Sequence, residues 1–343
     1  MFSETVYAGW GATLRESLVL KAILAGFTAL AVLATLPAKA QELWPAKRVT
    51  VIVPYPAGGY IDAVARLLSD GLRQTTGQQF VVINKSGGNG RIGLGDLVKS
   101  EPDGYTLLVN NDGGIGIPPA VDPTFPFSYK DGYTPIVQAV EAQYLMAVKA
   151  GLPVRTLNEF VGYAKSNPGK LNYGSSGIAS TPHVSAAYLA SHFKLDMVHV
   201  PYQGAAPVLN DFLAGVTDLY LPSIASIAGH LTNPSVRFLA TLGPGRVSVL
   251  PDDPTMAELG VKEMTMVGWL GVFGPPNLPV GLRDQISNLV EKLMVDPEQQ
   301  TKFRAIFADP VTKPGREFSP FYQSEVEKWK AFAERTGFKV APQ

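Results

Sequence analysis

Two short loops rich in glycine and hydroxyl side chains carry the most suggestive chemistry in this sequence. Residues 56–62 hold the adjacent pair Gly58 and Gly59, between an apolar run at 49–53 and a stretch with helical periodicity. Residues 174–183 hold four serine and threonine side chains just before a second stretch with helical periodicity. Backbone N–H groups exposed at a helix start bind anions, and hydroxyls donate hydrogen bonds to carboxylate oxygens. The two loops therefore predict a site for a small anion, and a carboxylate suits them best.

Several residues in and near these loops have a structural explanation beside the functional one. Asp62 falls in the first turn of the expected helix, where it could cap the helix, order water molecules or attract a ligand amine. The hydroxyl loop could also be a polar surface turn held by bonds between side chains and backbone. Two strand-to-helix turns, residues 202–207 and 222–226, could be walls of a binding pocket or plain turns.

Two enzymatic interpretations compete with simple binding. Ser176 or Ser180 could act as a nucleophile with His183, but the loop has no G-x-S-x-G elbow, so we expect His183 to cap or pack the loop. Residues 88–93 match G-x-G-x-x-G, with Asp112 about 20 residues further on, as in dinucleotide-binding folds. The match follows the second strand and precedes a short glycine-rich helix, which favours a structural turn. The four histidines have no tight ligand spacing, so no metal is expected.

Alternating strand-like and helix-like segments must position these loops. Apolar runs at 49–53, 80–84 and 105–110, with an amphipathic stripe at 61–72, have a β-α-β order that implies a parallel sheet. Further strands are expected at 133–140, 144–150, 197–202, 219–222, 236–241 and 267–273, and helices at 157–166, 182–191, 206–214, 280–294 and 320–336. The segments at 144–150 and 267–273 could cross between two lobes. A cleft between lobes is a common place for ligands to bind.

Composition and charge exclude several other classes of protein. The 343 residues include no cysteine, which excludes disulfides, thiol nucleophiles and cysteine-based zinc sites. The 29 basic and 29 acidic residues balance, whereas a general nucleic-acid binder would have a basic excess. Residues 1–40 have the layout of a secretory signal, with Arg15 and Lys21 before an apolar run at 22–36 and a small-x-small pattern ending at Ala40. We expect cleavage near Ala40 and export; an uncleaved membrane anchor is the alternative.

The order and spacing of many short motifs resemble those of the periplasmic substrate-binding components of tripartite tricarboxylate transporters, the Bug family. The resemblance spans residues 44–338 and is carried by Ala57-Gly58-Gly59 with Asp62 and Arg66, Asn84 with the glycines of 87–93, residues 102–108, Gly174-Ser175 with Gly177 and His183, residues 200–202 with Gly204 and Pro207, Asp211, Gly215 and Asp218, residues 253–255 with Glu258 and Gly260, Trp269 with Gly271, and Ser319-Pro320 with Lys328-Trp329.

This resemblance implies an α/β fold of the two-lobed Venus flytrap type (periplasmic-binding-protein type II), with a cleft between the lobes. We expect residues 41–146 and 268–343 to form the first lobe and residues 147–267 the second. The family grips one ligand carboxylate with the loop at 174–181, and the other end of the ligand faces the loop at 56–62. Three residues depart from the usual pattern: Ser86 replaces a proline, Tyr60 is larger than usual, and Gln203 replaces a common lysine.

The expected ligand-binding residues come from both lobes. They are Tyr55, Pro56, Ala57, Gly58, Gly59, Tyr60 and Asp62 in the first lobe, and Gly174, Ser175, Ser176, Ile178, Ser180, Thr181, His183, Gln203, Gly204 and Ser223 in the second. Neither loop contains an arginine clamp, so hydrogen bonds rather than ion pairs should dominate. Tyr55, Tyr60 and Tyr202 suggest that the ligand could be an aromatic carboxylate stacked on a tyrosine.

The sequence thus predicts an exported, periplasmic solute-binding protein that captures a small mono- or dicarboxylate and is not an enzyme. We expect no cofactor, no metal, no nucleic acid and a monomer, with the membrane subunits of a tripartite transporter, or a sensor, as partners. An exported serine hydrolase and a sensory protein that signals to a membrane receptor are the alternatives.

Overall fold

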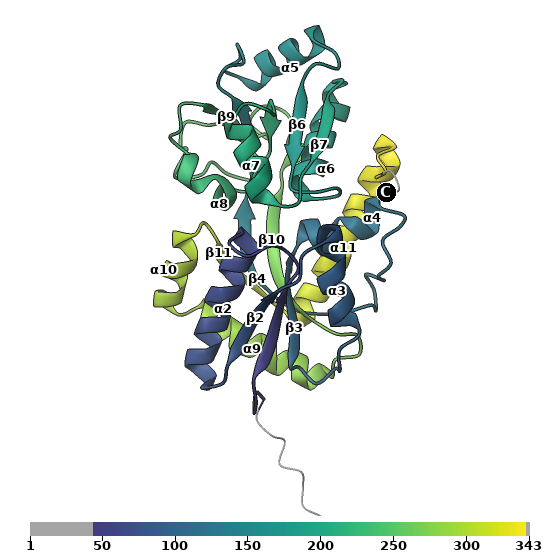
Figure 1. Cartoon of the computed structure of the whole chain (residues 1–343), viewed down its shortest axis with the longest axis vertical. Helices are drawn as coiled ribbons and strands as arrows, with labels where there is room; N and C mark the ends of the chain where they lie inside the picture. Colours follow the sequence, from purple (N-terminus) through teal and green to yellow (C-terminus); the bar gives the residue numbers. More distant parts are fainter. Residues whose placement is uncertain (1–43, 341–343) are drawn as a thin grey trace, which may run out of the picture. The chain divides into compact units, whose positions relative to one another are not determined.

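Two separate β-sheets organise residues 44–340, the part of the chain that the computed structural model describes (Figure 1). We call the six-stranded sheet and its helices the first lobe, and the five-stranded sheet and its helices the second lobe. The first sheet has the spatial order β11 (Asp309–Pro314), β4 (Thr134–Gln143), β10 (Val267–Gly274), β3 (Thr106–Asn111), β1 (Val49–Val53) and β2 (Phe80–Asn84). The signal segment expected at residues 1–40 lies outside the described residues.

The first sheet is mixed, which corrects the expectation of a parallel sheet. Strand β1 is parallel to both β2 and β3, as the β-α-β order predicts. Strand β10 is antiparallel to β3 and β4, and β11 is antiparallel to β4. The chain leaves the first lobe after β4 and returns in β10, so these neighbours run in opposite directions. Local periodicity carries no information on that return path.

Helices cover both faces of the first sheet because its strands are apolar on both sides. Val49, Val51 and Val53 face α2 (Tyr60–Thr76) and α9 (Val280–Met294), whereas Ile52 faces α3 (Arg91–Val98) and α11 (Gly315–Thr336). The short helix α4 (Pro118–Val121) follows β3, and α10 (Pro297–Ala305) precedes β11. The apolar stripe of α2 packs on the sheet as its periodicity predicts.

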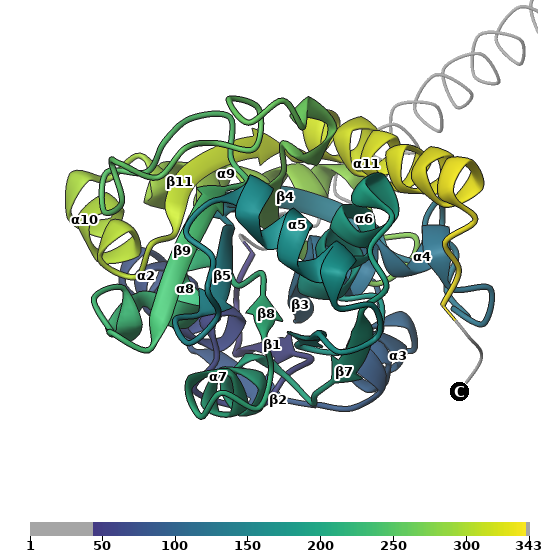
Figure 2. The same ribbon diagram turned by 90° about the horizontal axis from the view of Figure 1, so that it is seen from above.

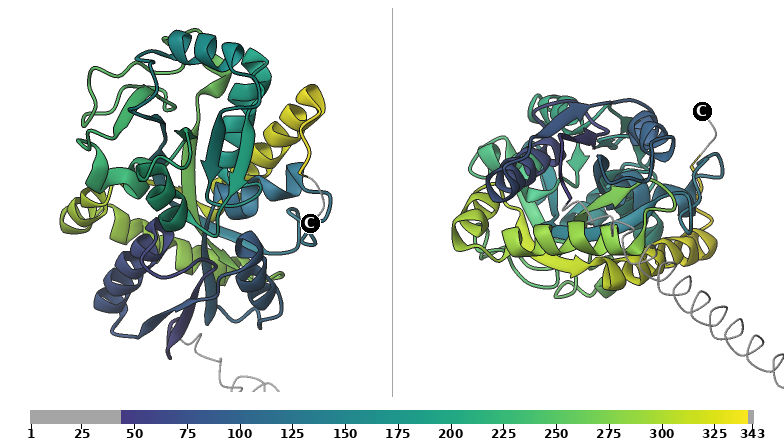
Figure 3. Two further views of the ribbon diagram at one scale, coloured as in Figure 1. Left: turned by 45° about the horizontal axis from the view of Figure 1, so that its top comes forward. Right: turned by 90° about the horizontal axis from the view of Figure 1, so that it is seen from below.

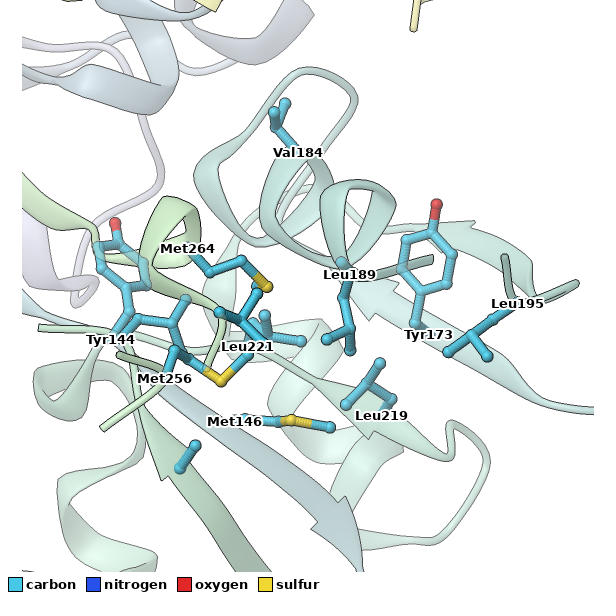
Figure 4. Close-up of a cluster of buried hydrophobic side chains, with 14 of the residues drawn as sticks. Tyr144, Met146, Tyr173, Val184, Leu189, Leu195, Leu219, Leu221, Met256 and Met264 are labelled. Atoms are coloured by element: carbon cyan, nitrogen blue, oxygen red, sulfur yellow. The ribbon is translucent and has the colours of Figure 1, made fainter. Parts of the chain in front are cut away.

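The second lobe contains the strands that lie between β4 and β10 in the chain. Its spatial order is β7 (Val198–Pro201), β6 (Asn172–Ser175), β8 (Leu219–Tyr220), β5 (Leu145–Lys149) and β9 (Val236–Thr241). Figure 2 shows α5 (Leu157–Ser166) and α6 (Thr181–Phe193) on one side of this sheet, and α7 (Ala205–Leu213) on the other. Helix α8 (Ile224–Ile227) follows β8. Methionine and leucine side chains fill the core under α6 (Figure 4).

Helix α11 is a third connection between the lobes, beside the two chain crossings. Its first half packs on the first sheet through Phe318 and Tyr322. Its last turns reach the second lobe (Figure 3). There the centre of the Phe332 ring lies 5.1 Å from that of Tyr188 on α6. Among residues 44–340, no helix combines the length and the apolar character needed to cross a membrane.

Candidate functional site

The loop after β1 is shaped by a buried carboxylate. Asp62 accepts hydrogen bonds from the backbone N–H of Gly58 and from Arg66 Nε, both at 2.9 Å, and from Asn84 Nδ2 at 2.9 Å. Burial raises the pKa of Asp62, but these bonds outweigh it, so its pKa lies below the usual value. Gly58 has a φ of +83°, which glycine adopts without strain. Asp62 therefore holds the loop in shape, and both of its oxygens already have partners.

The loop between β6 and α6 bonds mainly to itself. Ser180 donates its hydroxyl to the Gly177 carbonyl at 2.6 Å, and the Ala179 N–H donates to His183 Nδ1 at 3.0 Å. Ser175 is fully buried, with its hydroxyl 2.7 Å from His199 Nε2. Two of the four expected hydroxyl donors, Ser175 and Ser180, thus shape the loop, and His183 caps it, as the sequence suggested.

Two stacked histidines, His183 and His199, hydrogen-bond to residues of the loop at 174–183. The rings of His183 and His199 are 3.8 Å apart and nearly parallel. Burial, together with the neighbouring His199 ring, lowers the pKa of His183 to about 3, and burial lowers the pKa of His199 to about 4. Both rings are therefore neutral at pH 7. Within residues 44–340, neither Ser176 nor Ser180 hydrogen-bonds to a histidine, so the Ser–His arrangement of the alternative hydrolase hypothesis does not form at those two serines.

A cavity of about 110 Å³ lies between the two loops. Its volume is roughly that of four water molecules in the liquid. A larger cavity of about 430 Å³ adjoins it and shares Tyr55, Pro56, Asn89, Ser176, Gln203 and Gly204 with its lining. None of the described side chains that line the smaller cavity is Lys, Arg or His. An anion bound there would be held by neutral donors.

Most of the expected site residues meet at these cavities. The smaller cavity is lined by Tyr55, Pro56, Ala57, Gly59, Tyr60, Asp62, Ser176, Ser180, Thr181, Gln203, Gly204 and Ser223, and Ile178 lines only the larger one. The turns at 202–207 and 222–226 contribute walls, as proposed from the sequence.

Four expected residues line neither cavity: Gly58, Gly174, Ser175 and His183. Gly58 and His183 act within the loops described above. Gly174 and Ser175 belong to β6, where a side chain at Gly174 would come within 2.5 Å of Val208 on α7. Strand β6 continues to Ser175, so the serine side chain turns inward to His199 rather than toward the cleft.

Side chains from distant strand ends complete the smaller cavity, and the sequence analysis did not identify them. They are Asn89, Asn111, Tyr144 and Tyr220. In Figure 4 the Tyr144 hydroxyl points away from the methionine and leucine side chains drawn with it. Tyr60 also lines the cavity, and its hydroxyl is buried with no partner among the described residues. Burial and the charge of Asp112 raise the pKa of Tyr144, so this phenol stays protonated and can donate.

Direct hydrogen bonds join the two lobes beside the cavity. Asn89 Nδ2 donates to the Ile178 carbonyl of the second lobe at 2.8 Å and to the Gly113 carbonyl of the first lobe at 3.2 Å. Thr181 Oγ1 donates to Asp112 Oδ2 at 3.0 Å. The glycine turn at 88–90, noted for its G-x-G-x-x-G pattern, thus positions Asn89 in the cleft. No group of three or more His, Asp or Glu side chains in the described part of the chain is arranged to hold a metal ion.

Comparison with known proteins decides the family. Residues 64–338 match the model of the tripartite tricarboxylate transporter family receptor. The chain belongs to this family. Its fold therefore agrees with the expected two-lobed periplasmic-binding-protein architecture, and the resemblance to the Bug proteins is confirmed. Members of this receptor family are solute-binding proteins.

Three solved structures place this receptor among its relatives. The periplasmic binding protein BugD is 26% identical, with a TM-score of 0.78 over 86% of this chain and 99% of BugD. Rpa4515 of Rhodopseudomonas palustris, solved with adipate, is 29% identical, with a TM-score of 0.81 over 88% of this chain and 100% of its own. MatC of the same organism, solved with malate, is 26% identical, with a TM-score of 0.78 over 84% of this chain and 99% of its own.

Proposed function

We propose that this receptor is a periplasmic solute-binding protein that captures a small carboxylate between its two lobes and delivers it to membrane subunits of a tripartite transporter. The observation that carries the proposal is the 110 Å³ cavity between both loops, in which Asp62, whose oxygens are occupied, is the one charged side chain among the described lining residues. The carboxylates in the names of two similar structures, adipate and malate, support the ligand class.

A carboxylate that enters the cavity loses its hydrogen bonds to water. Neutral groups in the cavity wall can donate hydrogen bonds in their place. The hydroxyls of Ser176 and Tyr60 line it, as do loop residues that precede α2 and α6. Buried polar groups are stable when they are hydrogen-bonded, and aligned N–H groups at helix starts favour an anion without a cationic side chain. The site therefore suits an anion with one or two carboxylates.

A thermal-shift panel tests the ligand class. Purified protein is mixed with adipate, malate and benzoate, and mass spectrometry identifies any ligand released on denaturation. Stabilisation by benzoate would support an aromatic ligand beside Tyr55 and Tyr60, whereas stabilisation by aliphatic acids alone would exclude it. Tyr202, the third tyrosine named for stacking on an aromatic ligand, lines only the larger cavity, and its hydroxyl donates to Asp211 at 2.7 Å.

Gly59 offers a matched pair of variants for locating the site. A side chain at this position would lie 3.7 Å from its nearest neighbour, and the φ of −79° accepts any residue. Gly59→Asp would place a negative charge at the cavity, whereas Gly59→Asn has the same shape and no charge. We expect Gly59→Asp to lose at least tenfold more affinity than Gly59→Asn in calorimetry. Equal affinities of the two variants would show that the ligand binds elsewhere.

A further inference from the structure

The cleft buries an acid that the proposed carboxylate site does not use. Asp112 lies at the end of β3, and the residues on either side of it, Asn111 and Gly113, line the smaller cavity. Its side chain is 5% exposed. One carboxyl oxygen accepts the Thr181 hydroxyl, and the other, Oδ1, is buried with no partner among the described residues.

Among residues 44–340, no Lys, Arg or His lines the smaller cavity beside this carboxyl group. Tyr55, Tyr60 and Tyr144 face it from three separate segments and are neutral phenols. The turn that begins at Asp112 packs against α11, which contributes Glu325 and Lys328. The hydroxyls of Tyr133 and Tyr322 donate to the carbonyl of Ile115 in the same turn. Lys328 is exposed. Its charge lowers the pKa of Asp112, and the charge of Glu325 raises it. A ligand carboxylate in the cavity would add a second negative charge without a counterion.

We propose that Asp112 makes ligand capture proton-linked: when the lobes close on an anionic ligand, the Asp112 carboxyl group takes up a proton. The inference rests on the proposed function. Separation of the lobes would break the Thr181 bond and return the carboxyl group to water, where it ionises readily. Closure removes the water, and a bound anion repels the ionised form further.

The electrostatics of the closed cleft agree with this geometry. Burial raises the pKa of Asp112 to about 7, although the bonds from Thr181 and the Gly113 backbone lower it in part. A free aspartate has a pKa of about 4, so closure binds a proton over the range between these two values. In that range affinity falls as pH rises, by about tenfold per pH unit for one proton. The neutral acid can also donate from its unpartnered oxygen.

Calorimetry of the whole protein with adipate, malate or benzoate tests the proposal. The acid that stabilises the protein most is titrated at pH 6 and pH 7, in two buffers with different ionisation enthalpies. We expect the Kd to rise about fivefold from pH 6 to pH 7, because pH 7 is already near the closed-state pKa, and about 0.9 proton to be taken up at pH 6. Asp112→Asn should bind with the same Kd at both pH values and take up no proton, because its amide oxygen can still accept the Thr181 hydroxyl.

Asp309→Asn is the control. The charge of Asp309, like that of Asp112, raises the pKa of Tyr60, but Asp309 itself is exposed to water. The variant should keep the pH dependence of the unmodified protein. Binding of the acid without proton uptake, or a pH dependence that persists in Asp112→Asn, would overturn this inference and leave the proposed function intact. Proton release on binding would overturn it in favour of a cationic ligand group beside Asp112. Failure of all three acids to bind would instead overturn the proposed function, and this inference with it.

Discussion

Thr181 donates its hydroxyl across the cleft to Asp112, with 3.0 Å between Oγ1 and Oδ2. The two residues come from different lobes, at the start of α6 and the end of β3, and both are buried. This bond forms only while the lobes are together. It therefore contributes to the free energy of closure and not to the stability of either lobe alone.

Replacing Thr181 by valine should weaken ligand binding without unfolding the protein. The valine keeps the volume but removes the hydroxyl that donates to Asp112 Oδ2. The loss of one buried bond corresponds to about 1–2 kcal/mol, or roughly 5- to 30-fold in Kd. Calorimetry measures the Kd, and Thr181→Ser, which keeps the hydroxyl, serves as the control. Equal affinities of the two variants would contradict a role for this bond in closure.

Asn89 provides a second test of the inter-lobe contacts. Its amide donates to a carbonyl in each lobe, so Asn89→Asp would point a carboxylate at two carbonyl oxygens. We expect Asn89→Asp to lose about tenfold or more in affinity, and small-angle scattering to show a smaller ligand-induced compaction. Asn89→Gly accommodates the φ of +50° and removes the side chain, so it should lose less. A smaller loss in the aspartate variant than in the glycine variant would contradict this account.

Asp62 should protect the first-lobe loop against acid. Its pKa is lowered in the folded state, so its stabilising effect is complete above its unfolded pKa of about 4 and disappears as pH falls through the folded value. Asp62→Asn should reduce the free energy of unfolding by about 1–3 kcal/mol at pH 7 and by less at pH 3. Chemical denaturation at both pH values measures this difference. A destabilisation that grows toward pH 3 would show that the charge of Asp62 is not what holds the loop.

The stacked histidines should make the second lobe sensitive to mild acid. Burial keeps His183 neutral, with a pKa lowered to about 3, whereas unfolded histidine titrates near 6.5. The unfolded chain therefore binds more protons in this range, and stability falls as pH drops from about 6.5 to about 4, by on the order of 3 kcal/mol for His183. His183→Asn, whose amide oxygen can accept the Ala179 N–H, should lose less stability between pH 7 and pH 4. His192→Asn, on the exposed side of the same helix, should behave like the unmodified protein.

The sequence was sufficient to place elements with strong patterns. The expected helix at 280–294 and the strands at 49–53 and 80–84 coincide with α9, β1 and β2, because each has an uninterrupted apolar pattern between clear breaks. Helix α11 starts at Gly315, five residues before its expected start at Pro320, so this proline lies inside the helix and not at its beginning, where prolines are most common. Helix α10 and strand β11 were not predicted because both are short and their apolar residues follow no clear period.

The candidate site was predictable only where it is local in sequence. The loops at 56–62 and 174–183 could be recognised from their glycines and hydroxyls before helices. Tyr144 and Tyr220 could not, because aromatic residues at strand ends also fit a buried core. Asp112 was noted only as part of a nucleotide-binding pattern. Its position opposite Thr181 depends on how the two lobes meet, which residues 69 positions apart do not reveal through any local pattern.

The larger cavity has a practical consequence for optical detection. Its wall includes Ser86 from the first lobe and Gln203 from the second, and both side chains are exposed. Since the sequence contains no cysteine, a single cysteine introduced at either position would be the only thiol available for labelling. An environment-sensitive dye at Ser86, which lines only the larger cavity, would lie where the two lobes face each other, so its emission would report capture and the lining of the smaller cavity would stay unchanged. The receptor is thus a natural scaffold for a reagentless fluorescent sensor of its own ligand.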